Sequence, residues 1–447
     1  MLASNSRVMV LGVGCLVLLP PRSGALTIHV PADESTIQGA IHAATDGDEV
    51  VIAPGRYGET VDFLGKGITV RGTDPSDSVV VAATIVDGGG AGSVFTFDSG
   101  EGRASVLAGL TLTGGSGTVI HQGRWGGVST AGGGVYIEGA SPRVEDCVVR
   151  DNAVSGGWIT TGGMGGGISC SGGGIPLIAR TRIERNSSTK HGGGIAADGE
   201  TRPTVLESAV LDNEATPGGN WAASGGGIFL RGTPSARIIR SEVRGNRAQK
   251  DGGGLYAKGA DFTLLHAIFA GNTASGDFGG GADVIGGASG DIVNTIFAQN
   301  DAPIGAGVQV HDSSVELENC TFVGNVAGIR GGAIFDGDRA EVRATNCVLW
   351  YDTPDEIDSF GTQPDVTYSS IRGGWNGQGN VACGPRFVAY KGFELILGVG
   401  STCIDAGDPQ IEDGLSDWHP RWPAWYPDAP RSDMGAYGGP RNGDWLP

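Results

Sequence analysis

The sequence predicts an all-β fold, a parallel β-solenoid, because two features recur in register along the chain. Glycine triplets or their degenerate versions return every 26, 27 or 33 residues, beginning at Gly132, Gly165, Gly192, Gly225, Gly252, Gly279, Gly305 and Gly331. An Asn follows each first glycine by 20 or 21 residues, and an Asp replaces it in the eighth unit. These residues are Asn152, Asn186, Asn213, Asn246, Asn272, Asn300, Asn325 and Asp352. Eight units in register are typical of a solenoid with one coil per unit.

Each coil contains at least two short strands. The third and fifth positions after the first glycine are apolar, as in Val135 and Ile137, which is the alternation of a strand with one buried face. A second strand precedes each Asn and carries a column of small residues, which suits an inward stack. The glycines fit corners with little room for a Cβ atom. The Asn residues fit another turn, where their side chains bond the backbone or the next Asn.

Residues 1–25 read as a signal peptide. Arg7 precedes an apolar run over residues 8–19, and small residues at 23–25 predict cleavage after Ala25. The run is shorter than the ~20 residues that a membrane-spanning helix needs. We therefore expect a secreted or cell-surface protein without membrane insertion.

Three further segments follow the signal. Residues 26–131 should hold the first coils and a capping helix that starts after Ser35 or Thr36, with Ile37, Ala40 and Ile41 on one face. Residues 132–352 form the glycine-rich coils. Residues 353–447 lose the repeat and become rich in Pro, Trp and Asp, as expected of a C-terminal cap or small module.

The composition restricts the partners. The chain of 447 residues carries a net charge of −19 at pH 7, which disfavours nucleic acid and anionic lipid. An acidic polysaccharide is also repelled, unless local cations or bound metal ions reverse the field. Cys383 and Cys403 flank a short terminal segment and could pair.

Three stretches carry a resemblance to known proteins. STIQGAIHAATDGDEVVIAPGRYGETVDFLGKGITVRG resembles the opening of secreted right-handed parallel β-helix proteins of the pectin-lyase-like superfamily. FAGNTAS, FAQN, FVGN and GGAI resemble polymorphic outer-membrane-protein repeats. CGPRFV, FELILGVGSTCIDAGDP and RSDMGAYGGP are similar to the choice-of-anchor region of bacterial surface proteins. The resemblance implies a right-handed coil and export.

The activity is less constrained than the fold, because that superfamily includes lyases, hydrolases, esterases, epimerases and adhesins. The sequence has no Asp-Asp pair and no Gly-His-Gly, so the polygalacturonase arrangement is absent. The elements of common pectate lyases and of mannuronan epimerases are absent as well. No active site can therefore be carried over residue by residue.

The fourth and sixth positions after each first glycine should point outward. At the sixth, Asp198, Arg231 and Lys258 fall on consecutive coils. The aromatic residues at the fourth position are Tyr136, Phe229, Tyr256 and Phe335. Aromatic faces beside fixed charges suit a polysaccharide groove, in which Lys258 or Arg231 would act as base or charge neutraliser. Asp198 and Glu138 could help to hold an ion. The alternative is a solvated face whose opposite charges pair across coils.

Two other groups of residues are candidates for binding. Trp125, Trp158 and Trp221 precede glycine triplets, the last two in the 33-residue units, and loops on one edge often form a binding face. Packing against the rod is the alternative. Calcium is a candidate cofactor that acidic residues near the C-terminus could bind. The alternative is that these residues only form a solvated acidic cap. They are Asp405, Asp408, Asp413, Asp417, Asp428 and Asp433.

These observations predict an exported β-helix protein that binds an extracellular polysaccharide and processes it by lyase-type cleavage if it is an enzyme. The alternative is a non-enzymatic, adhesin-like surface rod.

Overall fold

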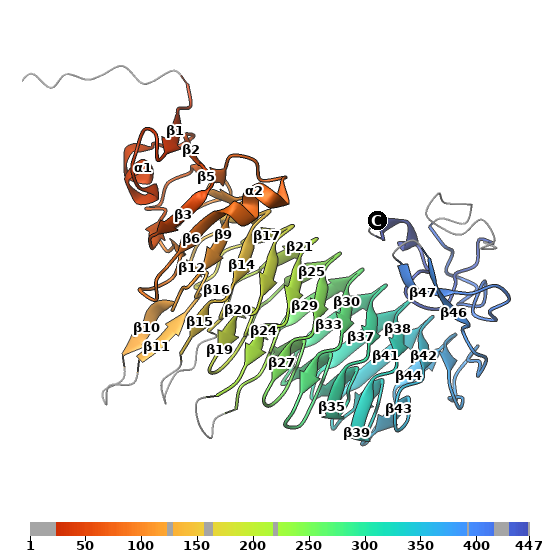
Figure 1. Cartoon of the computed structure of the whole chain (residues 1–447). Coiled ribbons are helices and arrows are strands. Elements are labelled where there is room, and N and C mark those ends of the chain that lie inside the picture. Colours follow the sequence, from red (N-terminus) through yellow and green to blue (C-terminus); the bar gives the residue numbers. More distant parts are fainter. Residues whose placement is uncertain are drawn as a thin grey trace, which may run out of the picture.

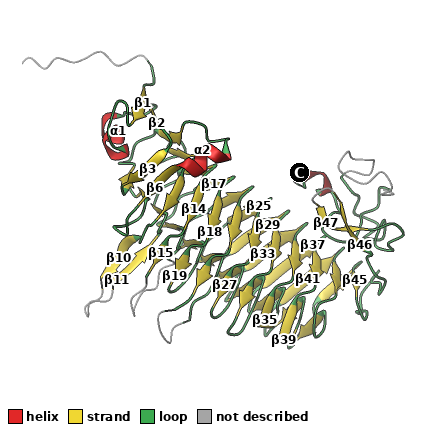
Figure 2. Ribbon diagram, viewed as in Figure 1, coloured by secondary structure: helices red, strands yellow, loops and turns green. Residues whose placement is uncertain are grey.

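A computed structural model of the chain describes residues 24–122, 128–155, 164–217, 222–390, 393–414 and 429–445. The chain winds into a parallel β-helix whose coils stack from the N-terminal end to the C-terminal end (Figure 1). Strands make up most of the regular structure, and the helical turns lie at the two ends of the rod (Figure 2). The all-β prediction is confirmed.

Three long parallel sheets, faces A, B and C, and one shorter sheet, face D, form the sides of the rod. Face A has 13 strands, from β1 (Thr27–Val30) to β44 (Asp365–Thr367). Face B has 12, from β3 (Gly55–Gly58) to β45 (Ser370–Ile371). A shorter sheet of seven, face D, runs from β15 (Ala153–Val154) to β39 (Val326–Arg330).

Face C holds the strands that follow the glycine triplets. It has 11 strands: β4 (Val61–Asp62), β7 (Phe95–Phe97), β12 (Val135–Glu138), β16 (Ile168–Ser171), β20 (Ile195–Asp198), β24 (Ile228–Arg231), β28 (Leu255–Lys258), β32 (Ala282–Ile285), β36 (Val308–His311), β40 (Ile334–Asp336) and β43 (Ile357–Ser359). One glycine unit thus adds one strand to each long sheet.

The core lies inside the coils, as the alternation predicts. Val135 and Ile137 are fully buried. Phe269, Phe297 and Phe322 stack from coil to coil, with ring centroids 5.3 and 4.9 Å apart. This column continues along the rod, so each coil is stabilised by the coils on either side of it.

The glycine triplets are corners with no room for side chains. Gly252 has φ +64°, in the left-handed region that favours glycine. A Cβ atom on Gly253 would lie 2.6 Å from the carbonyl oxygen of Gly280 in the next coil. The triplets therefore permit backbones of neighbouring coils to approach closely.

The Asn residues form a continuous ladder inside the rod. The backbone N–H and the Nδ2 atom of Asn213 donate to Asn246 Oδ1 at 2.9 and 3.0 Å, while its Nδ2 also donates to Ile183 O at 2.9 Å. The pattern repeats from Asn152 to Asp352. Each buried amide is satisfied by its neighbours, which explains the fixed position of Asn in the repeat.

The N-terminal end is covered as predicted. Helix α1 (Ile37–Ala43) starts after Thr36, whose hydroxyl accepts from the Gly39 N–H at 3.0 Å. Ile37, Ala40 and Ile41 are its buried residues. A second helix, α2 (Ser78–Ala83), was not predicted from the sequence, and Asp77 caps it. None of the described helices has the length and apolar character needed to cross a membrane.

The C-terminal segment lies against the last coils (Figure 1) and includes the hairpin of β46 (Phe387–Tyr390) and β47 (Phe393–Leu397). Asn294 Nδ2 donates to the carbonyl oxygen of Ala436 at 2.9 Å, and Asn319 Nδ2 donates to that of Asp433 at 2.7 Å. Cys383 and Cys403 are not bonded to each other in this structure. Polar corner residues of the coils thus hold the C-terminal segment in place.

Candidate functional site

The three charged residues that were predicted to lie on consecutive coils do so on face C. Arg231 is paired in register with Asp198 on one side and with Lys258 on the other. The Arg231 guanidinium makes two bonds to Asp198, Nε to Oδ1 at 2.9 Å and Nη2 to Oδ2 at 2.5 Å. Lys258 is exposed. The structure therefore brings the three residues together, and it places Arg231 in an ion pair.

The aromatic side chains at the fourth position are largely covered, in contrast to the open faces expected from the sequence. Tyr136 and Tyr256 are each only 8% exposed, and Phe229 is 2% exposed. Phe229 stacks on Tyr256 with centroids 5.4 Å apart, and the ring of His191 covers its other side at 4.4 Å. The physical reason is the corner: at the first glycine of the triplet the chain folds back, so the residue before it lies beside the fourth position.

The same packing changes the titration of two tyrosines. Burial raises the pKa of Tyr136 to about 12, with a contribution from the Glu138 carboxylate. Burial also raises the pKa of Tyr256, and the carboxyl groups of Asp283 and Asp251 add to it. Both phenols stay neutral across the physiological range. Trp125, Trp158 and Trp221 lie outside the described residues.

Farther along the rod the row of fourth-position side chains opens into a groove of about 570 Å³, the face C groove. It crosses the coils of β28, β32, β36 and β40. Its aromatic walls come from Tyr256, Phe278, Phe335 and Phe360. Its charged and polar lining includes Lys250, Asp251, Lys258, Asp283, Gln309 and Arg330. The groove thus combines apolar faces with polar groups on consecutive coils.

Two carboxyl groups of the groove differ in their surroundings. Asp283 is 1% exposed, and burial, with the nearby Asp251 carboxyl, raises its pKa well above the usual range. Asp251 is 5% exposed; burial raises its pKa too, but the ammonium group of Lys250 lies 3.2 Å from its Oδ2 and opposes the shift. Burial therefore disfavours the charged form of both carboxyl groups, and Lys250 opposes this most directly at Asp251, with which it forms an ion pair.

The sequence matches the protein family described as "Right handed beta helix region" over residues 65–266 and 166–349. The chain belongs to this family. Among solved structures it is similar to the crystal structure of pectate lyase Pel9A, with a TM-score of 0.46 and 15% sequence identity over 93% of this chain and 96% of that chain. No curated protein matches the sequence. The family match confirms the predicted right-handed parallel β-helix.

Of the groove residues in this β-helix, sequence reasoning selected Lys258 and Tyr256 and missed Asp251 and Asp283 as site residues. The sequence did contain a signal for Asp283: it and Gln309 are polar residues at the fourth position of consecutive units. The structure shows that both side chains are buried. Asp251 was not detectable in the same way, because it precedes the triplet and lies outside the strand alternation.

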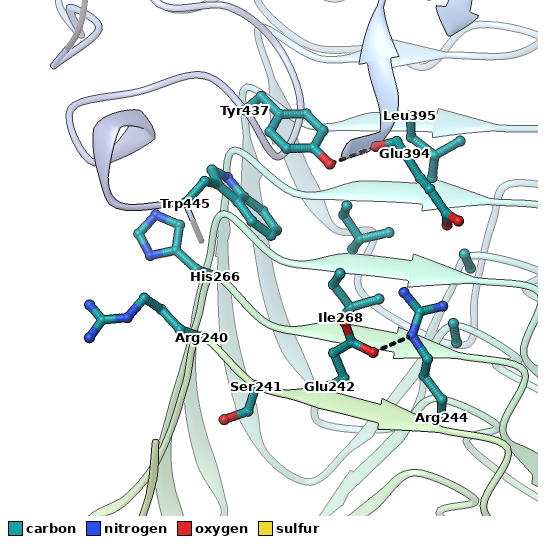
Figure 3. A pocket seen from close by; sticks show the side chains of 13 residues that line it. Arg240, Ser241, Glu242, Arg244, His266, Ile268, Glu394, Leu395, Tyr437 and Trp445 are labelled. Carbon is teal, nitrogen blue, oxygen red and sulfur yellow. Dashed lines mark hydrogen bonds and ion pairs between the residues drawn. The ribbon is translucent and has the colours of Figure 1, made fainter. Parts of the chain in front are cut away.

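A second pocket, of about 260 Å³, lies at the seam between face B and the C-terminal segment (Figure 3). Its polar walls pair locally: Arg244 Nε donates to Glu242 Oε2 at 2.9 Å, and Tyr437 Oη donates to the carbonyl oxygen of Glu394 at 2.6 Å. Trp445 packs against Tyr437 at 4.9 Å. These contacts explain the pocket as part of the docking of the C-terminal segment.

Within the described ranges no three His, Cys, Asp or Glu side chains are placed to hold a metal ion together. The C-terminal acids predicted as calcium ligands bond backbone N–H groups instead. Asp405 accepts from Ala429 at 2.9 Å, and Asp433 accepts from Asp405 at 2.7 Å. Asp417 and Asp428 fall outside the described ranges.

Proposed function

We propose that this protein is exported and binds an extracellular polysaccharide in the face C groove. The observation that carries the proposal is a groove of about 570 Å³ that runs across consecutive coils and pairs aromatic walls with polar groups. Sites for organic ligands combine apolar walls with a few polar groups that fix orientation. A polysaccharide also suits this site, because its sugar units repeat along the chain as the coils repeat along the rod.

Export rests on the sequence of residues 1–25, which has the features of a cleaved signal. The outer-membrane-like repeats and the choice-of-anchor-like region, which starts within residues 353–447, favour a final position at the cell surface. In this arrangement the coils of residues 132–352 would present the groove to the surrounding matrix.

Lyase-type cleavage is a second candidate, and the observation that favours it is the exposed Lys258 at the groove. Lys258 would act as the base. Arg231 would neutralise a substrate carboxylate only after release from Asp198, which holds it through two hydrogen bonds. Trp125, Trp158 and Trp221 would extend the contact surface along the loops that precede the triplets.

A binding screen tests the proposal. The purified mature protein is presented with neutral and acidic polysaccharides, in calcium and in chelator, and ultraviolet absorbance records unsaturated products. Binding that weakens in Lys258→Ala, but not in Arg343→Ala on face A, supports the groove. Release of unsaturated products establishes a lyase. Absence of binding to every polysaccharide would favour the adhesin-like rod.

A further inference from the structure

The floor of the face C groove has an ordered chemical pattern. Phe229, Tyr256, Asp283, Gln309 and Phe335 occupy the same position on five adjacent strands and are paired in register. Two polar side chains thus lie in the middle of a row that is aromatic on either side. Adjacent strands are ~4.8 Å apart, so the polar pair covers about one coil spacing.

Three polar atoms at this floor are buried without a partner. Among the described residues, Asp251 Oδ1, Asp283 Oδ1 and Gln309 Oε1 have no hydrogen-bond partner. The three side chains are 5%, 1% and 2% exposed, and all three line the groove. A buried polar atom without a partner destabilises the fold, so a ligand that supplies the missing partner removes that penalty.

Other buried polar atoms of the described residues, such as Thr233 Oγ1 and Asp336 Oδ1, also have no partner, but the three at the floor all line the groove. The buried Asn residues of the ladder use both their donors and their acceptor; Asn272, for example, donates to Val243 O and Asn300 Oδ1 and accepts from Asn246. The ladder therefore satisfies its own buried amides. The unpaired atoms lie together at a groove, which is where a ligand can reach them.

Gln309 Oε1 accepts hydrogen bonds, and each carboxyl oxygen accepts or, when protonated, donates, so the ligand needs groups that can do both. A carboxylate or sulfate would bring further acceptors and a negative charge to the carboxyl groups of Asp251 and Asp283. An ammonium group would meet Lys250, whose Nζ already lies 3.2 Å from Asp251 Oδ2, and Lys258 and Arg330 on the walls. Hydroxyl groups donate without charge, and the rings of Tyr256 and Phe335 suit the apolar face of a sugar.

We propose that the floor of the face C groove binds the hydroxyl groups of a neutral sugar residue, and that the polysaccharide recognised there is a neutral one rather than a polyuronate. This inference rests on the proposed function and narrows it. Lyase chemistry requires a uronate, so in this account Lys258 contacts the sugar and does not abstract a proton.

Two variants test the floor directly. Gln309→Met and Asp283→Leu keep side chains of the same length and remove the polar atoms. Because each removes an unpaired buried polar atom, both variants should unfold at temperatures no lower than the wild type. A loss of binding in a protein of undiminished stability separates ligand recognition from a structural role. Arg343→Ala, on face A, is the matched control.

The measurement is isothermal titration calorimetry of the mature protein with oligosaccharides from neutral glucan, mannan, xylan and galactan, from polygalacturonate and alginate, and from chitosan. We expect at least one neutral glycan to bind, at least tenfold weaker binding of it by either floor variant, and unchanged binding by the control. Tighter binding of a polyuronate or of chitosan than of every neutral glycan overturns the inference and leaves the proposed function standing. Undiminished neutral-glycan binding by both variants also overturns it. Failure of every glycan to bind overturns both proposals.

Discussion

Asn325 Nδ2 donates a hydrogen bond to Asp352 Oδ1 at 2.6 Å, and this contact ends the amide ladder of the rod. Every earlier member of the ladder must donate and accept, which requires an amide. The last member receives from Asn325, and the coil that follows it carries no further Asn of the ladder, so a carboxyl group is sufficient there. Asp352 lies beside Glu356, and burial with this second carboxyl raises its pKa well above the usual range.

The ladder predicts unequal effects for two exchanges between an amide and a carboxyl group. Asn272→Asp removes donors to Val243 O and Asn300 Oδ1 and buries a carboxyl group against acceptors. We expect the free energy of unfolding to fall by about 3 kcal/mol. Asp352→Asn keeps the acceptor and removes one of two adjacent carboxyl groups, so its effect should stay within about 1 kcal/mol. Urea denaturation at pH 7 compares the two, and equal losses would contradict the account.

The corner glycines predict a second pair of results. Gly253→Ala places a Cβ atom 2.6 Å from the backbone of both Gly280 and Thr273, and should lower the free energy of unfolding by about 2–3 kcal/mol. Gly58→Ala meets nothing within 4 Å and should leave the stability unchanged or slightly raise it. Thermal unfolding followed by circular dichroism measures both, and a tolerated Gly253→Ala would show that the coils can separate at the corners.

Asp336 predicts a pH dependence of stability. Its side chain is 1% exposed, and burial raises the pKa to about 7. A carboxyl group with a raised folded-state pKa contributes its stability below the unfolded-state pKa, and this stability is lost as pH rises toward 7. Asp336→Asn should therefore be about 4 kcal/mol more stable than the wild type at pH 8 and little different at pH 4. Chemical denaturation of both proteins at the two pH values tests this prediction. An equal gain in the free energy of unfolding at both pH values would exclude titration of Asp336 as the cause.

The ion pair of Asp198 and Arg231 predicts a small, salt-dependent coupling. The two side chains are 24% and 29% exposed, so water screens their attraction. A double-mutant cycle with Asp198→Ala and Arg231→Ala should give a coupling energy of about 1 kcal/mol that decreases in 0.5 M salt. A coupling that salt leaves unchanged would mean that packing, rather than charge, joins the two coils.

The fold could be predicted because each coil repeats the same local requirements. Glycine at the corner, Asn in the ladder and alternating apolar residues recur in register, and Thr36 carries an ordinary helix-capping signal. Helix α2 escaped prediction because it is short and has only Asp77 as a start signal.

The site was harder to predict, because side chains brought together by the coil are far apart in sequence. Alternation places Tyr256 outside the core of the coil, but it says nothing of the chain that returns at the corner and covers it. The docking of the C-terminal segment is equally hidden, since Asn294 meets Ala436 across 142 residues. Lys258, at the exposed end of its strand, and Tyr256 were found from the pattern, but the cover over Tyr256 was not.

The central claim is that a polysaccharide occupies the face C groove, and protection of Lys258 from amine modification tests it most directly. Lys258 is exposed and lines the groove, while Lys66 lies near α1 and donates to carbonyl oxygens there, among them Ala44 O at 2.7 Å. Reductive methylation followed by mass spectrometry gives the rate at each lysine, with and without a saturating polysaccharide. The account predicts at least fivefold slower modification of Lys258 and an unchanged rate at Lys66. An unchanged rate at Lys258 while the polysaccharide is bound would place the binding site elsewhere on the protein.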